Sequence, residues 1–369
     1  MTSGQIEIQL LAVVVAVACA LPGTFLVLRR LALVSDAISH SILLGIVLGF
    51  FVAGDVNSPL LLLGAALVGL LTVVLVSLLQ RTGLVKEDAA IGLVFPALFS
   101  IGVILISRYA NDVHLDLDAV LLGELAFAPF DRLVFWGWDF GPISLVVMSL
   151  ILALNLTAVT VFWKELKLST FDPALAVALG FTPALVQYGL MSLVSLTAVG
   201  AFDAVGSILV VALMIAPPAT AYLLTDSLPR LLVLAGALGA AAALSGYWLA
   251  YLLDASIAGA MATMTGLFFL LAWLLAPDRG LVAAVGRRAR QRLEFAQTML
   301  AIHLANHEGR PEAAVESRVE HLQRHLRWEP SFAERIVRGA ERRGLVQQHS
   351  GRLELTDAGR TVAAEAVVR

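Results

Sequence analysis

Nine apolar runs, each close to the ~20 residues that a helix needs to cross a bilayer, dominate the sequence. They cover residues 6–28, 31–53, 59–79, 90–107, 142–163, 185–202, 204–224, 231–253 and 257–276. Runs of this length in lipid must satisfy their backbone polar groups internally, which predicts helices. The sequence therefore predicts an all-α polytopic membrane protein with about nine transmembrane helices. The sixth and seventh runs are broken only around Asp203 and Gly206, so eight spans is the alternative.

Composition separates this apolar part from a polar carboxyl-terminal part. The chain is 59% hydrophobic and 14% charged, whereas soluble domains carry about a quarter charged residues. Residues 279–369 hold 16 of the 25 basic side chains, although they make up about a quarter of the chain. We expect a transmembrane domain over residues 1–280 and a small domain over residues 281–369. A single cysteine, Cys19, excludes a disulfide within the chain.

Basic residues flank alternate ends of successive apolar runs. By the positive-inside rule, the amino terminus then faces out and the carboxyl terminus faces the cytoplasm. Nine spans satisfy this alternation, and eight would break it. The basic residues on the predicted inner side are Arg29, Arg30, Arg81, Lys86, Lys164, Lys167, Arg230, Arg287, Arg288, Arg290 and Arg292.

The polar tail has the pattern of a small α+β domain. Helices are predicted over residues 293–305, 312–326 and 331–343, followed by two short alternating segments around Ser350-Gly351 that indicate a hairpin. A last helix is expected from Thr356. Three helices, a two-stranded wing and a terminal helix predict a cytoplasmic winged-helix domain.

The second apolar run carries two ionisable side chains, Asp36 and His40. Charged groups inside a bilayer are costly and usually functional, and a spacing of four places both on one helix face. If the helix begins at Leu31, His40 lies roughly 14 Å deep, near the bilayer midplane. The residues Ala37, Ser41, Gly45 and Gly49 form a neighbouring stripe of small side chains that allows close helix packing.

A carboxylate and an imidazole suit Mn²⁺, Fe²⁺ and Zn²⁺ alike. Two ligands are too few to hold an ion, so we expect a two-fold dimer to bring two copies of Asp36 and His40 together. The alternative is a hydrogen bond between the two side chains that only holds the helix bundle together. Asp203, in the short break, is either a gate or ligand at the outer mouth of the pathway, or an ordinary loop acid.

A short helix is predicted over residues 173–179, between the fifth and sixth runs on the cytoplasmic side. Asp172 is suited to cap its amino end, Pro173 to its first turn and Gly180 to its carboxyl end. Such a helix either seats against another protein or simply connects two spans.

The tail contains two four-spaced histidine pairs, His303/His307 and His321/His325. We interpret them as solvated helix histidines rather than a metal site, because neither pair has a nearby cysteine or carboxylate at a known ligand spacing. The arginines of the third tail helix alternate with Glu334 and Glu341, which favours a regulatory or subunit-contact role over DNA binding.

Four motifs, in order, resemble the membrane permeases of ATP-driven manganese, zinc and iron importers. The resemblance covers about residues 5–280, and the tail resembles the winged-helix part of metal-dependent repressors. The motifs are Ser35-Asp36-Ala37-Ile38-Ser39-His40, Lys86-Glu87-Asp88-Ala89-Ala90-Ile91-Gly92, Phe171-Asp172-Pro173 with Gly180, and Val205-Gly206-Ser207-Ile208-Leu209-Val210 leading to Ala216-Pro217-Pro218-Ala219.

The resemblance implies that Asp36 and His40 line the metal pathway in a multi-pass protein of the bacterial plasma membrane. It implies that Phe171, Asp172, Pro173 and Gly180 belong to a coupling helix seated on a separate cytoplasmic ATPase. It further implies a second permease copy or a related permease, and an extracytoplasmic metal-binding protein. No tightly bound cofactor is expected, because the metal ion is the cargo.

The chain lacks a GxxxxGK[ST] phosphate loop, so we expect it to be a non-catalytic subunit. Two alternatives stay open. The first is a gradient-driven, proton-coupled cation transporter, in which Asp36 and His40 relay protons. The second is a membrane-tethered metal sensor that uses the tail. The coupling helix discriminates between an ATP-driven importer and the gradient-driven transporter, because it has a purpose only where an ATPase docks.

Overall fold

The structure, a computed structural model, describes residues 2–54, 58–109, 125–135, 138–311, 313–319, 321–322, 326, 328–349 and 351–368. Its internal contacts divide the chain into two compact units, Met1–Arg279 and Gly280–Arg369. Each unit has its own hydrophobic core and is described by itself.

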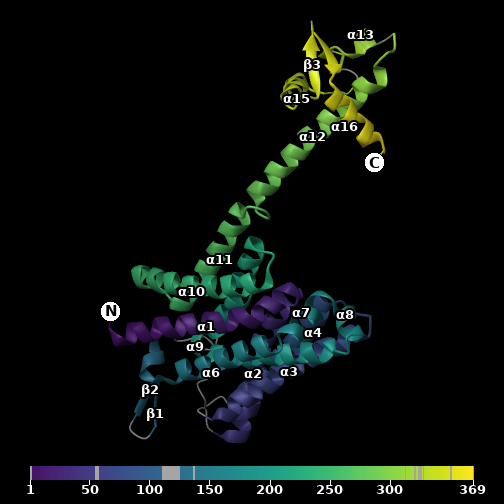
Figure 1. Cartoon of the computed structure of the whole chain (residues 1–369). Helices are drawn as coiled ribbons and strands as arrows, with labels where there is room; N and C mark the ends of the chain where they lie inside the picture. The colour runs from purple at the N-terminus through teal and green to yellow at the C-terminus, as the bar shows by residue number, and fades with distance from the viewer. Residues whose placement is uncertain are drawn as a thin grey trace. The chain divides into compact units, whose positions relative to one another are not determined.

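The first unit is a bundle of long apolar helices (Figure 1). Short elements connect them: a 3₁₀ turn η1 (Leu125–Phe130), a hairpin of β1 (Arg132–Phe135) and β2 (Trp138–Pro142), and the helices α7 (Trp163–Phe171) and α8 (Pro173–Ala178). The long helices are α1 (Ser3–Leu28), α2 (Ala32–Ala53), α3 (Pro59–Arg81), α4 (Glu87–Tyr109), α6 (Ile143–Val161), α9 (Pro183–Leu224), α10 (Leu228–Leu253) and α11 (Ile257–Leu275).

Within the described residues, nine helical segments are long and apolar enough to cross a membrane, which confirms the predicted number of apolar helices. Two of them, Pro183–Phe202 and Ala204–Leu224, lie within α9. They are separated at Gly206, whose φ of 76° and ψ of 164° belong to a region that essentially only glycine adopts. Which ends of the helices face the cytoplasm stays a prediction.

The break at Gly206 bends α9 back along α1. Asn155 of α6 donates to both the Ala18 carbonyl and Thr197, and Met214 lies against Gly23. In a straight helix Thr197 and Met214 would lie about 25 Å apart, whereas Ala18 and Gly23 are separated by about 8 Å along α1. Both halves of α9 therefore pack on the same short stretch of α1.

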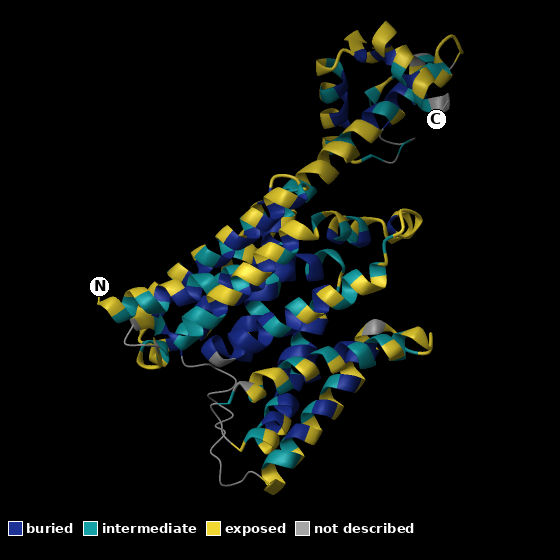
Figure 2. Ribbon diagram, turned by 60° about the horizontal axis from the view of Figure 1, so that its bottom comes forward, coloured by how far each residue is buried: buried dark blue, intermediate teal, exposed yellow. Residues whose placement is uncertain are grey.

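The centre of the first unit is α1, which packs against α6, α9 and α10. It is the most buried of the nine candidate spans, with 72% of its most apolar window inside the bundle, as the dark blue residues of Figure 2 illustrate. Its middle residues are small or aliphatic, which permits this central position. Cys19 is wholly buried there.

The second unit contains four helices and a hairpin among its described residues. They are α12 (Leu281–His307), α13 (Ala313–Glu316), α15 (Pro330–Arg342), β3 (Val346–His349), β4 (Arg352–Leu355) and α16 (Asp357–Val368). The strands pair antiparallel, with Val346 opposite Leu355 and His349 opposite Arg352, which confirms the predicted hairpin.

Two predicted helix bounds in this unit are wrong. The first helix begins at Leu281 rather than Leu293, so the basic stretch of residues 286–292 lies inside α12. The helix predicted over residues 312–326 is interrupted after Glu316, because Arg318 forms a bridge with Arg352 and the Ser317 carbonyl accepts from the Leu353 amide. Pairing with β4 thus outweighs the local helical pattern.

Candidate metal pathway

The candidate site lies on α2, which begins at Ala32 as the apolar run predicts. Asp36 and His40 stand one turn apart on the same face, with 3.4 Å between Asp36 Oδ1 and His40 Nε2. Their side chains are 43% and 31% exposed in the single chain, while Ser35, Ala37 and Ser39 beside them are buried. The two ligand-type groups therefore lie on a face of α2 that the described part of the chain covers only in part.

Two aromatic side chains of α4 border His40. The ring centroid of Phe95 lies 5.4 Å from that of His40, and the ring centroid of Phe99 lies 6.3 Å away in an edge-on orientation. These contacts restrict the rotation of the imidazole and shield one side of it from water. Sequence analysis missed Phe95 and Phe99, because their apolar character gives no local signal in an apolar helix.

The small residues predicted beside the pair pack α2 tightly on α3. A Cβ on Gly45 would lie 2.4 Å from the Gly64 carbonyl oxygen. A Cβ on Gly49 would lie 2.7 Å from the Leu60 carbonyl oxygen. Deeper in the same contact, Thr72 donates a hydrogen bond of 2.7 Å to Ser41. The backbone of α2 is thus fixed on one side, and the side chains of Asp36 and His40 project from the other.

The pair forms within one helix. An interaction between residues i and i+4 of α2 does not join two helices, so it does not hold this bundle together as the structural alternative required. Asp203 lies between the two apolar halves of α9, three residues before Gly206. Its side chain lies outside the described residues.

The predicted short helix is α8, which forms as the sequence indicates. The Asp172 carboxylate accepts a hydrogen bond of 2.9 Å from the Leu175 amide, Pro173 occupies the first turn, and Gly180 turns the chain with a φ of 85°. Apolar side chains in α8 and on both sides of it are exposed: Phe171 at the end of α7, Leu175 and Val177 in α8, and Leu179 just after α8 are 59%, 45%, 61% and 59% exposed.

The preceding helix, α7, is attached to the end of α1. The Arg29 guanidinium donates to Ser169 at 2.7 Å and to Thr170 at 3.0 Å. Burial lowers the pKa of the Arg29 guanidinium, but the pKa of a free guanidinium is so high that the charge remains. This contact fixes α7, and with it the start of α8, on the central helix.

Comparison with known proteins places this geometry in a family. The ABC 3 transport family matches residues 6–276. The zinc transport system membrane protein TroD of Treponema pallidum is 52% identical over 97% of both chains. The manganese transport system membrane protein MntD of Bacillus subtilis is 48% identical over 73% of this chain and 91% of its own.

A solved structure shows the same architecture. PsaBC from Streptococcus pneumoniae, determined in complex with a Fab, matches with a TM-score of 0.63 and 29% identity, covering 76% of this chain and 94% of that chain. An inward-facing metal-chelate type ABC transporter shares the fold at a TM-score of 0.54 and 22% identity, over 72% of this chain and 84% of that chain. The nine apolar helical segments of the described residues and these matches show that the chain is a multi-pass protein of the bacterial inner membrane and that it belongs to the ABC 3 transport family.

Proposed function

We propose that the chain is the transmembrane subunit of an ATP-driven importer that carries a divalent transition-metal ion into the cytoplasm. The observation that carries this proposal is the Asp36–His40 pair, half exposed on a membrane-spanning helix. The names of its relatives support it, since they include zinc, manganese and iron transport proteins. Carboxylate and imidazole serve all three ions.

The pair is suited to transient ligation. Two ligands bind an ion weakly, and an ion in transit must leave as readily as it enters. The exposed face of α2 also carries Leu33, Leu48 and Phe51, which are 51%, 44% and 43% exposed. Ionisable groups within a membrane face a protein interior or a water-filled cavity rather than lipid. A second permease therefore covers this face, and a two-fold dimer supplies two copies of Asp36 and His40.

The outer surface of α8 is the proposed seat of a separate ATPase. The four exposed apolar side chains, two in α8 and two flanking it, lie outside the membrane spans and are costly in water. Burial under a partner removes that cost. Phe171, Asp172, Pro173 and Gly180 then act together, since they end α7, start α8 and set its direction. An extracytoplasmic metal-binding protein would deliver the ion at the opposite side, where Asp203 is a candidate ligand.

The second unit is proposed to be a winged helix with a regulatory or subunit-contact role. Its helices and hairpin occur in the required order. Arg343 donates to Gln297 at 2.8 Å, and Arg338 lies 3.6 Å from Glu334. The Glu334 carboxylate offsets the charge of Arg338, and the bond to Gln297 holds the Arg343 side chain against α12, which supports the non-DNA role.

Reconstitution separates the ATP-driven importer from the gradient-driven alternative. We expect proteoliposomes that contain the chain, its ATPase and its metal-binding protein to accumulate metal with ATP present and with the proton gradient collapsed by an ionophore. Filtration and elemental analysis of the vesicles measure the uptake. Uptake that needs the gradient and ignores ATP would establish the proton-coupled transporter instead.

A substitution in α8 tests the ATPase contact. Val177→Asp places a charge in the apolar surface, and we expect co-purification of the ATPase to fall at least tenfold, about 1.4 kcal/mol. Val134→Asp in β1 is the matched control, because Val134 is 63% exposed, close to the 61% of Val177, and lies at the other end of α6. Equal loss in both variants, or loss in neither, would contradict the docking assignment.

A further inference from the structure

We propose that His303, His307 and Glu316 form a binding site for a divalent transition-metal ion in the second unit. These three residues are called the histidine cluster below. They lie outside the membrane-spanning helices and outside the part of the chain that the family match covers. The site therefore uses other residues than the Asp36–His40 pair and goes beyond the proposed function.

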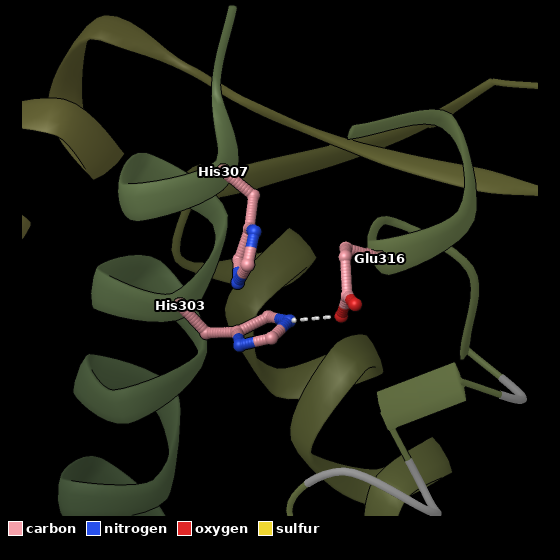
Figure 3. A group of neighbouring side chains, drawn as sticks. All are labelled: His303, His307 and Glu316. Atoms are coloured by element: carbon pink, nitrogen blue, oxygen red, sulfur yellow. Dashed lines mark ion pairs between the residues drawn. The ribbon is translucent and has the colours of Figure 1, made fainter. Parts of the chain in front are cut away.

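The chain brings the cluster together from separate segments. His303 and His307 lie one turn apart near the end of α12, with ring centroids 4.7 Å apart. Gly309, with a φ of 77°, turns the chain after α12, and Glu316 ends α13 on the opposite side of that turn. Figure 3 shows both imidazoles and the Glu316 carboxylate directed toward a common point.

The distances fit metal coordination. One ligand atom from each of His303, His307 and Glu316 lies within 4.8 Å of the other two. Glu316 Oε2 lies 3.5 Å from His303 Nε2 and 3.0 Å from His321 Nδ1. Ligands about 2.05 Å from a tetrahedral zinc ion are separated by roughly 3.3 Å, so the His303–Glu316 pair already stands close to the separation that an ion would impose.

Burial makes an ion more favourable here than at an exposed histidine pair. The His303 side chain is 7% exposed and that of Glu316 is 15% exposed, which corrects the interpretation of His303 as solvated. In the described part of the chain, the ion-pair partners of Glu316 are both histidines. A buried carboxylate needs a positive partner, and a divalent ion supplies that charge while the imidazoles stay neutral.

The ligand set indicates the class of ion. Two imidazole nitrogens and one carboxylate oxygen suit zinc and the neighbouring divalent ions of iron, cobalt and nickel, whereas Cu(I) prefers sulfur ligands. Three protein ligands leave the fourth position of a tetrahedral ion to water, and His321 lies beside the Glu316 carboxylate that would bind the ion. A bound ion would join the end of α12 to α13, and so make the stability of this unit depend on metal in its surroundings.

Metal binding to the full-length chain tests the proposal directly. The protein is purified in detergent, stripped with a chelator and titrated with Co²⁺, whose tetrahedral complexes absorb visible light strongly. We expect wild-type protein to give this absorption and the double variant His303→Gln/Glu316→Gln to lose it. Zinc bound after equilibrium dialysis, measured by elemental analysis, should fall by about one ion per chain in the double variant.

Three further variants make the result specific. Asp36→Asn/His40→Gln should keep the cobalt absorption, since its groups lie in the first unit. His349→Gln, which removes an exposed imidazole of β3, should also keep it. If the double variant does not fold, the single variant His307→Gln replaces it, because His307 is only half-buried. It too should lose the cobalt absorption. Cobalt absorption and zinc content equal to wild type in a folded cluster variant would overturn the proposal.

Discussion

Replacing Asp36 or His40 with alanine is expected to reduce ATP-driven metal uptake at least tenfold, for every ion that the wild-type protein carries. The carboxylate and the imidazole are the only ionisable groups of α2, and 3.4 Å separates them. Without one of them, the ion would lose one of the two ligands that we propose for it on α2. A tenfold loss corresponds to about 1.4 kcal/mol of lost stabilisation. Uptake of a radioactive or elementally quantified ion into proteoliposomes measures it.

Controls distinguish a loss of transport from a loss of folding in these variants. Both side chains are partly exposed and bond within their own helix, so their loss should leave the elution volume and thermal stability of the protein unchanged. Ser39→Ala is the control on α2, because its hydroxyl donates to the Ser35 carbonyl of the same helix, at 2.9 Å, among the described residues. Full accumulation of all tested ions in Asp36→Ala and His40→Ala would remove both residues from the pathway.

Gly45→Ala is expected to destabilise the first unit by about 1–3 kcal/mol, although alanine is the better helix former. The added Cβ would meet the Gly64 carbonyl oxygen at 2.4 Å and the Ala65 Cα at 2.5 Å. These are backbone atoms, so α2 and α3 must separate to admit the methyl group. Thermal unfolding in detergent, followed by loss of the monodisperse peak, measures the change.

Gly266→Ala is expected to change the stability of the protein in the opposite direction. Gly266 is exposed within α11, and a Cβ there would meet nothing within 4 Å. Helix propensity alone should then act and stabilise the protein by up to about 1 kcal/mol. A stable Gly45→Ala protein would show that the two helices tolerate a wider separation than their glycines indicate.

The fold of the first unit could be predicted largely because membrane spans have a local signal. Twenty apolar residues form a helix in lipid whatever their neighbours are, and even the break in α9 falls beside the residues that interrupt its apolar pattern. The closeness of Asp36 and His40 followed from their spacing alone. The positions of Phe95 and Phe99 beside His40 could not be predicted from the sequence, because contacts between helices depend on how the bundle packs.

The second unit shows where local patterns fail. Residues 312–326 have a helical pattern, yet the helix is interrupted at Ser317 and Arg318. These residues pair instead with residues of β4 that lie 34 or more positions along the chain. The histidine pair of α12 was expected in solvent for a similar reason. Its carboxylate neighbour, Glu316, comes from another segment, and no spacing within one helix could reveal it.

Cys19 has a practical consequence for the chemistry of the whole chain. It is the single cysteine, and the packing of α1 leaves its thiol without access to solvent. Alkylating reagents act on thiolates in water, so we expect Cys19 not to react with them and the unaltered protein to give no labelling. A cysteine introduced into any connecting segment would be the one reactive thiol, and the membrane side from which it reacts would report the orientation of that segment directly.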